Sequence, residues 1–201
     1  MKHAAAVRHL KRADPELAGW IARVGPCRLL PAAGGISHFE ALVRSIVYQQ
    51  LSGKAASTIH GRVVARCGGP PSPERLARLS DPDLRTAGLS AAKLKALRDL
   101  SARVADDRLP LKRVAELPDD ELIAAVSETR GIGVWTAQMF LMFQLGRPDI
   151  LPVSDLGIRK GFARVTGMKS LPAARTLERR AERWRPYRTV ASWYLWRVLE
   201  L

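Results

Sequence analysis

Hydrophobic residues recur at intervals of three and four along most of the chain, which is the spacing of one buried face of a helix. The segment 38–52, HFEALVRSIVYQQLS, is an example, because Phe39, Leu42, Val43 and Ile46 fall on one side of a helix. No segment alternates hydrophobic and polar residues for long enough to predict a β-strand. The pattern therefore predicts an all-α fold of roughly nine or ten helices joined by short loops.

Proline, glycine and serine mark the breaks between these helices. Two short helices are predicted to begin at Ser72-Pro73 and at Asp81-Pro82. The segment 134–145, VWTAQMFLMFQL, is apolar on nearly all sides, which is typical of a central buried helix. The remaining predicted helices are 54–67, 91–107, 118–127, 155–165, 171–184 and 186–201.

A glycine turn separates the predicted helices 118–127 and 134–145. Gly131 and Gly133 flank Ile132 there, and glycine permits backbone conformations and close approaches that other residues do not. Free amides at the start of the second helix would form an anion site that the glycines leave open to a phosphate. Taken alone, the turn is better explained as a helical hairpin whose glycines only permit close packing.

The charge of the chain narrows the choice of ligand. Lysine and arginine total 33 against 19 acidic residues, which gives the chain of 201 residues a net charge of +14 and indicates a polyanionic partner such as DNA.

The sequence gives no sign of a metal site or of a membrane segment. Cys27 and Cys67 have no ligand-spaced cysteine or histidine nearby, so we expect neither a zinc or iron–sulfur site nor a disulfide. No apolar run reaches membrane-spanning length and no signal peptide is visible, which predicts a cytosolic protein without a membrane partner.

The residues that follow the glycine turn resemble a known family. GIGVWTA, residues 131–137, closely resembles the helix-hairpin-helix element of the base-excision DNA glycosylase superfamily. The segment 182–196, ERWRPYRTVASWYLW, is similar to the closing Trp-x-Pro-aromatic-Arg signature of the alkylation-repair branch, 3-methyladenine DNA glycosylase II. Three more segments resemble the family in the expected order, and they are 46–56, 84–101 and 151–162.

The resemblance extends over about residues 35–200. It implies a helix-hairpin-helix core at 35–201 made of two helical lobes, with the hairpin at about 118–145 and with DNA and the flipped base held between the lobes. Residues 1–34 are expected to form a helical segment that packs on this core. They are too few for the extra N-terminal β-rich domain of the larger bacterial relatives.

Asp155 is the catalytic carboxylate that the resemblance implies. An acidic residue at this predicted helix start is by itself adequately explained as an N-cap. In the family, the carboxylate faces the deoxyribose, where it stabilises positive charge and positions or deprotonates water. We find no convincing second carboxylate to protonate the leaving group, which fits an N-alkylated purine that is already cationic. Bifunctional members carry a lysine where this chain has Trp135, so the resemblance implies hydrolysis without lyase activity.

The base pocket, the wedge and the DNA contacts are also implied by the resemblance. Trp135 and Trp196 are expected to hold the cationic base with their aromatic faces, beside Met139, although each tryptophan is equally explained as a core residue. Gln50 and Leu51 are both candidates for the wedge that fills the gap in the base stack, and the sequence does not choose between them. The expected DNA-binding residues are Arg130, Gly131, Ile132, Gly133, Thr136 and Lys160.

No cofactor is expected to be required. The hairpin of this family commonly holds a monovalent cation, Na⁺ or K⁺, through main-chain carbonyls, which would here be those of Ser127, Thr129 and Gly131. We therefore expect a monomeric, monofunctional DNA glycosylase that flips 3-methyladenine and related N-alkylpurines out of duplex DNA, in base excision repair in the bacterial cytosol or nucleoid. Two alternatives remain: a non-catalytic helix-hairpin-helix DNA-binding module, which would need neither Asp155 nor the tryptophans, and a glycosylase/lyase for oxidised bases.

Overall fold

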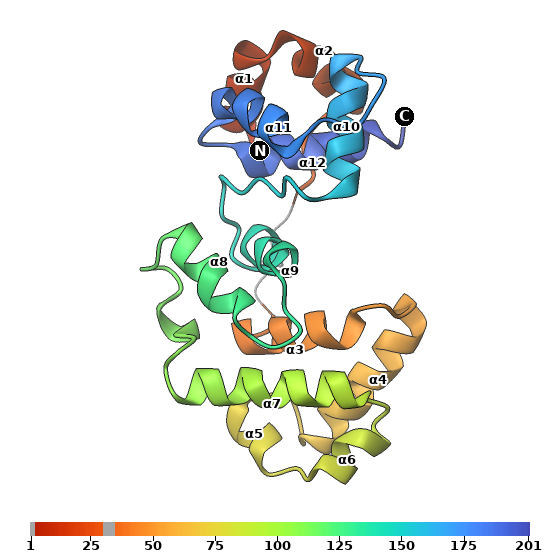
Figure 1. The fold of residues 1–201 in the computed structure, drawn as a ribbon, viewed down its shortest axis with the longest axis vertical. Coiled ribbons are helices and arrows are strands. Elements are labelled where there is room, and N and C mark those ends of the chain that lie inside the picture. Colours follow the sequence, from red (N-terminus) through yellow and green to blue (C-terminus); the bar gives the residue numbers. More distant parts are fainter. Residues whose placement is uncertain (1–2, 30–34) are drawn as a thin grey trace. The chain divides into compact units, whose positions relative to one another are not determined.

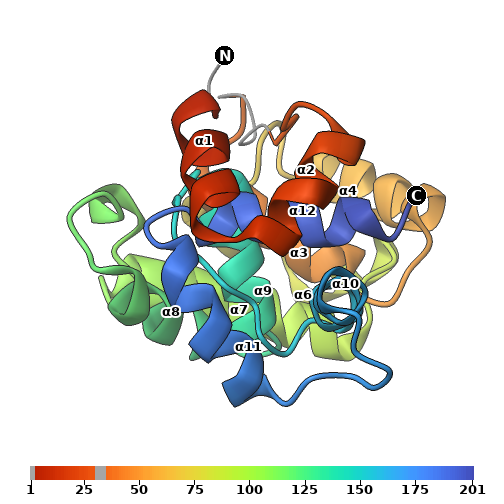
Figure 2. The same ribbon diagram turned by 90° about the horizontal axis from the view of Figure 1, so that it is seen from above.

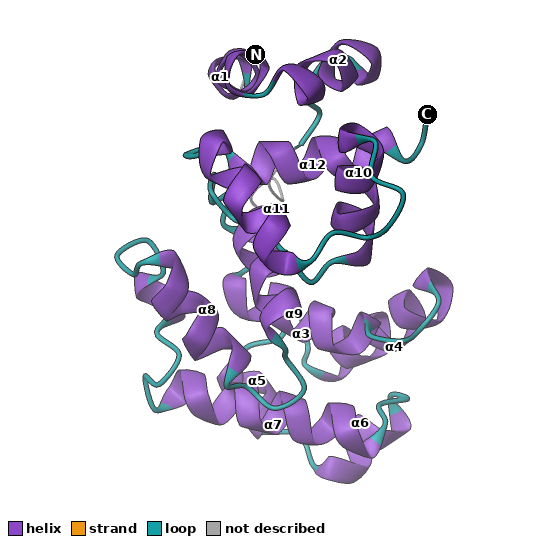
Figure 3. Ribbon diagram, turned by 45° about the horizontal axis from the view of Figure 1, so that its top comes forward, coloured by secondary structure: helices purple, strands orange, loops and turns teal. Residues whose placement is uncertain are grey.

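The computed structural model describes residues 3–29 and 35–201, and every regular element in these two ranges is a helix (Figure 3). The all-α prediction is confirmed. The described residues contain twelve α-helices, more than the nine or ten expected, because the segment before residue 30 folds into two helices of its own.

The helices follow one another through short loops. Their bounds are α1 (Ala4–Ala13), α2 (Pro15–Val24), α3 (His38–Tyr48), α4 (Gly53–Arg66), α5 (Pro73–Ala77), α6 (Asp81–Thr86), α7 (Ala91–Ala105), α8 (Asp119–Ser127), α9 (Val134–Met139), α10 (Leu156–Thr166), α11 (Ala174–Ala181) and α12 (Arg188–Val198). Short 3-10 turns lie at Leu111–Arg113 and Glu182–Trp184, and a π-helical turn lies at Phe140–Gln144.

The chain divides into two compact units, whose helices are labelled in Figure 1. Residues 33–140 form the first, which we call the hairpin unit because it contains the glycine turn. Residues 1–32 and 141–201 form the second, which we call the carboxylate unit because it contains Asp155. No helix among the described residues is long and apolar enough to cross a membrane.

The long helix α7 organises the hairpin unit. The helices α3, α5 and α6 all pack on it (Figure 1). Its apolar face is buried at Leu94, Leu97 and Leu100. Arg98 on the same helix donates to the main-chain carbonyls of Leu76 and Leu79, both at 2.6 Å. These bonds satisfy carbonyls at the end of α5 and fix this short helix against α7.

Serine residues begin five successive helices of the hairpin unit. Each accepts a hydrogen bond from the main-chain amide three residues further on, and they are Ser37, Ser52, Ser72, Ser80 and Ser90. Such an N-cap typically contributes about 1 kcal/mol to helix stability, because it satisfies an amide that has no partner inside the helix. The predicted start at Ser72-Pro73 is confirmed, and the helix predicted from Asp81 is capped by the preceding residue, Ser80.

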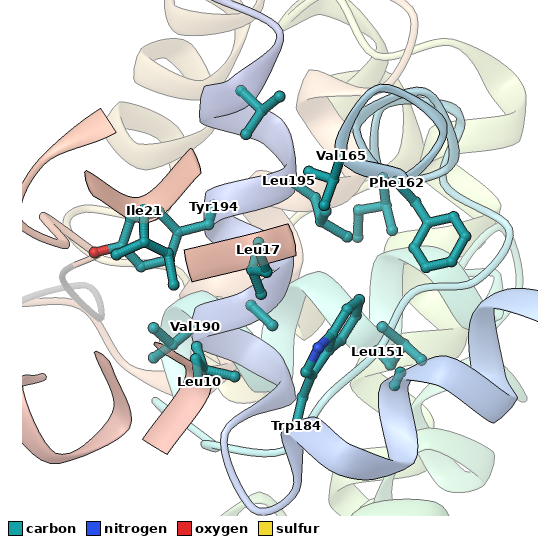
Figure 4. Packing of buried hydrophobic residues seen from close by; sticks show 14 of the residues in the cluster. Leu10, Leu17, Ile21, Leu151, Phe162, Val165, Trp184, Val190, Tyr194 and Leu195 are labelled. Atoms are coloured by element: carbon teal, nitrogen blue, oxygen red, sulfur yellow. The ribbon is translucent and has the colours of Figure 1, made fainter. Parts of the chain in front are cut away.

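The carboxylate unit is built around α12. Helix α10 packs along it, and α1 and α2 of the N-terminal segment pack on the same helix (Figure 2). One hydrophobic cluster joins these helices (Figure 4), and its members include Leu10, Leu17, Ile21, Leu151, Phe162, Trp184, Tyr194 and Leu195. The first two helices therefore share a core with α12, the last helix of the chain.

The buried carboxylate of Asp14 connects the N-terminal helices to the segment just before α12. Asp14 caps α2 and accepts hydrogen bonds from Nε and Nη2 of Arg180, at 2.9 and 2.6 Å, and from Nε1 of Trp184 at 2.9 Å. Burial raises the pKa of Asp14, but the hydrogen bonds from Arg180 and Trp184 outweigh this effect and hold the pKa below its ordinary value. Trp184 is the first residue of the closing Trp-x-Pro-aromatic-Arg signature, so this residue has a structural role.

Candidate active site

The glycine turn joins α8 to α9 in the hairpin unit. Gly131 has a φ of +77°, in the left-handed region that favours glycine, and a Cβ there would lie 3.4 Å from the Cβ of Ala96. Gly133 has no such conformation, and a Cβ there would meet nothing within 4 Å. The first glycine is therefore needed for the turn itself, whereas the second leaves open space beside the main chain.

The helix that follows the turn is shorter than predicted. α9 ends at Met139, and Phe140–Gln144 form a π-helical turn, so the prediction of one α-helix over 134–145 is wrong in its second half. A π turn inserts one residue into the hydrogen-bond ladder, which rotates the side chains that follow it around the helix axis. Hydrophobic periodicity does not reveal such an insertion in a segment that is apolar on all sides.

A carboxylate on α7 fixes the glycine turn. Oδ2 of Asp99 accepts the main-chain N–H of Arg130 at 2.7 Å and Nε of Arg103 at 3.0 Å. Burial raises the pKa of Asp99, but these hydrogen bonds outweigh it and hold the pKa below its ordinary value. The main chain of Arg130 is thereby anchored while the residue remains exposed.

The main chain of the turn is what the hairpin offers to a ligand. Ile132 is only 3 % exposed, so its side chain belongs to the core and its predicted DNA contact is limited to main-chain atoms. Gly133 caps α9 without any side-chain hydrogen bond. Glycine itself therefore provides no side-chain cap for the first amides of α9, which lie at the positive end of the helix dipole.

A cavity of about 670 Å³ lies beside α3 and α9 within the hairpin unit. The predicted site residues Gln50, Gly131, Trp135, Thr136 and Met139 all line it. Trp135 is 47 % exposed, so it is not a core aromatic residue. The structure thus brings both predicted pocket residues of this unit to one cavity.

Three residues of α3 and its C-terminal end line the cavity although we did not predict them. They are Ser45, Tyr48 and Gln49. Nε2 of Gln49 donates to the main-chain carbonyl of Gly131 at 2.9 Å, which leaves the amide oxygen of Gln49 as its remaining acceptor. Their position in the sequence, shortly before the predicted wedge residue Gln50, could have indicated this, because the last turn of a helix and the loop that follows it lie close together in space.

Asp155 lies in the carboxylate unit as the N-cap of α10. Its Oδ1 accepts the main-chain N–H of Ile158 at 2.8 Å and the indole N–H of Trp196 at 2.9 Å. The N-cap interpretation is therefore confirmed. The half-buried carboxylate is in addition oriented by an aromatic side chain of α12.

Trp196 stands between Asp155 and a second aromatic residue. Its ring stacks on that of Phe143, with ring centroids 6.0 Å apart and an interplanar angle of 23°. Phe143 is itself 37 % exposed. The sequence predicted Trp196 as a base-pocket residue, but it did not reveal the hydrogen bond to a carboxylate 41 positions away.

Two glycines on one face of α10 let this helix approach α12 closely. A Cβ at Gly161 would overlap the main chain of Leu195, and a Cβ at Gly157 would lie 2.9 Å from Cδ1 of Trp196. Both positions require space rather than an unusual backbone conformation. The close approach brings the indole of Trp196 within hydrogen-bond reach of Asp155.

The segment before Asp155 is held by the start of α12. Oγ1 of Thr189 donates to the carbonyl of Arg147 at 2.7 Å and accepts the N–H of Ile150 at 2.9 Å. Arg188 binds Asp149 with two nitrogens, Nε to Oδ1 at 2.8 Å and Nη2 to Oδ2 at 3.0 Å. Arg188 is the last residue of the closing signature, and its contacts fix the loop that leads to α10.

The remaining predicted DNA contacts lie at the surface. Gln50 is exposed and Leu51 is 39 % exposed in the turn between α3 and α4. Lys160 is exposed on α10. Their contacts with DNA stay predictions.

The three predicted cation-binding carbonyls belong to the last residue of α8 and to the turn that follows it. The carbonyl of Gly131 accepts from Gln49 and that of Thr129 accepts the N–H of Ile132 at 2.9 Å, and each oxygen retains a second lone pair. The Oγ1 atom of Thr129 is buried and has no hydrogen-bond partner among the described residues. Ser127, the third predicted ligand, is the last residue of α8. The described parts of the chain contain no group of three histidine, cysteine, aspartate or glutamate residues that would hold a metal ion.

Comparison with known proteins assigns the fold and the sequence to one family. Residues 43–186 match the family model described as HhH-GPD superfamily base excision DNA repair protein. DNA-3-methyladenine glycosylase 1 of Schizosaccharomyces pombe is 34% identical over 166 residues, which cover 81% of this chain and 73% of that protein.

Two solved structures are similar over nearly the whole chain. The crystal structure of a DNA-3-methyladenine glycosidase from Bacillus halodurans has a TM-score of 0.88 at 38% identity, covering 95% of this chain and 87% of that one. The 3-methyladenine DNA glycosylase of Schizosaccharomyces pombe, solved in complex with abasic DNA, has a TM-score of 0.79 at 31% identity and covers 98% of both chains.

Proposed function

Because this chain belongs to the HhH-GPD superfamily of base excision DNA repair proteins, we propose that it is a monofunctional DNA glycosylase for alkylated bases in duplex DNA. Its substrates are 3-methyladenine and related N-alkylpurines, in keeping with the names of its relatives. The observation that carries the proposal is the carboxylate of Asp155, which two hydrogen-bond donors orient at the start of α10.

Asp155 supplies the charge that the reaction needs. When the bond between C1′ and the base nitrogen breaks, the electron pair of that bond leaves with the base. The pair neutralises the positive charge of the alkylated base, and positive charge develops on the sugar. The negative carboxylate stabilises that charge and positions or deprotonates the water that adds to C1′. An N-alkylpurine leaves without protonation, so a single carboxylate suffices, whereas sugar hydrolases generally use two.

The cavity of the hairpin unit supports base recognition. Trp135 offers an exposed indole to it, and a cationic ring is attracted to the electron-rich face of such a ring system. Met139 lines the same cavity and adds a polarisable, adaptable wall, which suits a range of alkylated bases. Within the carboxylate unit, Trp196 offers an aromatic surface on the part of its ring that Phe143 does not cover, while its N–H donates to Asp155.

DNA binding rests on charge and on the main chain of the hairpin. The net charge of +14 attracts the phosphate backbone, and the main chain at the start of α9 donates to a phosphate beside Gly131, Ile132 and Gly133. Thr136, Arg130 and Lys160 add side-chain contacts. The same net charge opposes self-association, which supports action as a monomer.

The hairpin also suits a monovalent cation. Main-chain oxygens are the ligands that hard cations prefer, and the buried hydroxyl of Thr129 without a partner fits a polar occupant nearby. Ser127, Thr129 and Gly131 would hold Na⁺ or K⁺ through their carbonyls. The ion would supply positive charge for a bound phosphate, and base hydrolysis does not otherwise require a cofactor.

The residue at position 135 supports hydrolysis without strand cleavage. An amine nucleophile is needed to form a Schiff base with the sugar, and Trp135 has none. The enzyme therefore leaves an intact abasic strand, which a separate activity must cleave.

The proposal is tested by following release of free 3-methyladenine from methylated duplex DNA, with borohydride present in a parallel reaction. We expect base release, no trapped protein–DNA adduct, and a strand that breaks only after alkali. A protein that binds this DNA without releasing any base would be a non-catalytic DNA-binding module. A borohydride-trapped adduct in high yield would show a lyase instead.

A further inference from the structure

We propose that Lys93 and Gln49 are positioning residues that hold Gln50, and not Leu51, ready for insertion into the base stack. The inference rests on the proposed function and concerns the turn between α3 and α4. It assigns a role to Lys93, which donates hydrogen bonds to main-chain carbonyls at the C-terminal end of α3.

The backbone of the turn is unusual at Gln50. The residue has a φ of +55°, in the left-handed region that side chains with a Cβ rarely adopt. Asp107 is the other non-glycine residue with positive φ among the described residues. Such a conformation persists only where neighbouring groups hold it, and it is often found where a side chain has a task.

Lys93 supplies one of the holding contacts. From the first turn of α7, its Nζ donates to the carbonyls of Val47 and Gln49, at 2.7 and 2.9 Å. These carbonyls lie at the C-terminal end of α3, where no further helical amide is available to them and where a cation is favoured by the helix dipole. Lys93 is half-buried, and burial lowers the pKa of its ammonium group, so these carbonyls replace part of its hydration.

Gln49 supplies the second contact and fixes the turn relative to the hairpin. Its Nε2 donates to the carbonyl of Gly131 at 2.9 Å, across 82 residues of sequence. The orientation of the amide follows from chemistry, because a carbonyl only accepts. The residue before Gln50 is thus bound through its carbonyl to α7 and through its side chain to the turn that we propose binds phosphate.

Position beside the cavity favours Gln50 over Leu51 as the inserted residue. Both residues are exposed, but Gln50 lines the 670 Å³ cavity together with Trp135, whereas Leu51 does not line it. A residue that replaces a flipped base must stand next to the place that receives the base. A turn that is already held in shape loses little conformational freedom when it enters the duplex, which strengthens binding.

The test uses duplex DNA that contains a stable tetrahydrofuran abasic site opposite 2-aminopurine, whose fluorescence responds to a side chain inserted beside it. The variants are Lys93→Met, Gln50→Ala, the double variant, and Lys95→Met as the control. Lys95 is an exposed lysine on the same helix, so Lys95→Met removes the same charge without these hydrogen bonds. Affinity for undamaged duplex and thermal melting are measured for every variant.

We expect Lys93→Met and Gln50→Ala each to weaken abasic-site binding by about tenfold relative to undamaged duplex and to reduce the fluorescence change, as expected for the loss of charged hydrogen bonds or of the inserted group. Lys95→Met should lower both affinities equally. The double variant should bind like Gln50→Ala alone, because Lys93 acts through Gln50. Lys93→Arg, which keeps the donors and the charge, should recover most of the loss.

Additive losses in the double variant, or a Lys93→Met variant that behaves like Lys95→Met, would overturn the proposal. If Lys93→Met does not fold, Gln50→Gly decides, because glycine keeps the left-handed backbone and removes only the side chain. It should lose the fluorescence change, and Leu51→Ala should lose less of it; the reverse order would contradict the assignment. Failure of the parent to release 3-methyladenine would count against the proposed function and not against these binding results.

Discussion

An aromatic side chain helps to orient the carboxylate of Asp155. Trp196 donates its indole N–H to Oδ1 at 2.9 Å, and its ring is supported by Phe143. A charge that stabilises a transition state is most effective when it is already in place before the reaction, because no energy is then spent on reorienting it. The indole N–H therefore affects the rate of base release through the position of the carboxylate.

Replacing Trp196 with phenylalanine tests this role. Phe keeps an aromatic ring against Phe143 but cannot donate to Asp155, so single-turnover release of 3-methyladenine should slow by about tenfold, the loss expected for one hydrogen bond to a charged group. Affinity for abasic DNA should change much less. Trp193→Phe on the same helix is the control, and an equal loss of rate in both variants would assign Trp196 to packing alone.

Residue-level features could be predicted from the sequence where they depend on the residue type and its neighbours along the chain. Asp155 lies at the start of α10, where the sequence alone suggests an N-cap, and it is that N-cap, while its catalytic role stays a prediction. Trp135 and Met139 line one cavity. Asp99 and Gln49 were missed. Their hydrogen bonds reach Arg130 and Gly131, 31 and 82 residues away, and a single sequence contains no information on such pairs.

Most helices were predictable because local and tertiary preferences agree. Helix α4 was predicted at 54–67 and spans Gly53–Arg66, and α7 was predicted at 91–107 and spans Ala91–Ala105, both after a serine cap. The π turn at Phe140–Gln144 was not predictable, because it depends on how the backbone meets its neighbours and not on side-chain periodicity.

The close contact between helices α10 and α12 positions the carboxylate of Asp155. Gly161→Ala would push a Cβ into the main-chain carbonyl of Leu195, so the free energy of unfolding should fall by about 3 kcal/mol. Gly61→Ala in the middle of α4 is the matched control, because a Cβ there meets nothing within 4 Å and alanine favours the helix. Denaturant unfolding should show a loss for the first and a small gain for the second. Equal stability of Gly161→Ala and the parent would mean that the helices can separate freely.

At the scale of the whole molecule, Asp14 links the N-terminal helices to the segment before α12. Its carboxylate is fully buried and receives Arg180 and Trp184, which lie 166 and 170 residues away. Asp14→Asn removes the charge facing Arg180 and one strong acceptor, so it should reduce the free energy of unfolding at neutral pH by about 2 kcal/mol. Asp106→Asn, which alters an exposed ion pair with Arg108, should change it little.

The pH dependence of that loss has a definite sign. The folded-state pKa of Asp14 lies below its ordinary value of 3.8, so its charge stabilises the fold above that pH, and the contribution disappears as the pH falls through the lower, folded-state value. Thermal melts of the parent and of Asp14→Asn should therefore differ fully at pH 5 to 7 and converge as the pH falls below about 3.8. A difference that stays constant down to the most acidic pH would show that the charge of Asp14 does not contribute.

The most direct test of the catalytic proposal is single-turnover release of 3-methyladenine from methylated duplex DNA by the parent and by Asp155→Asn. Asparagine keeps the shape and can still cap α10, so the melting temperature and the affinity for abasic DNA should be retained. Loss of the negative charge should slow base release by about a hundredfold or more, since about 3 kcal/mol of electrostatic stabilisation is removed. An Asp155→Asn variant that melts like the parent and releases the base at the parental rate would contradict the assignment of this carboxylate to catalysis.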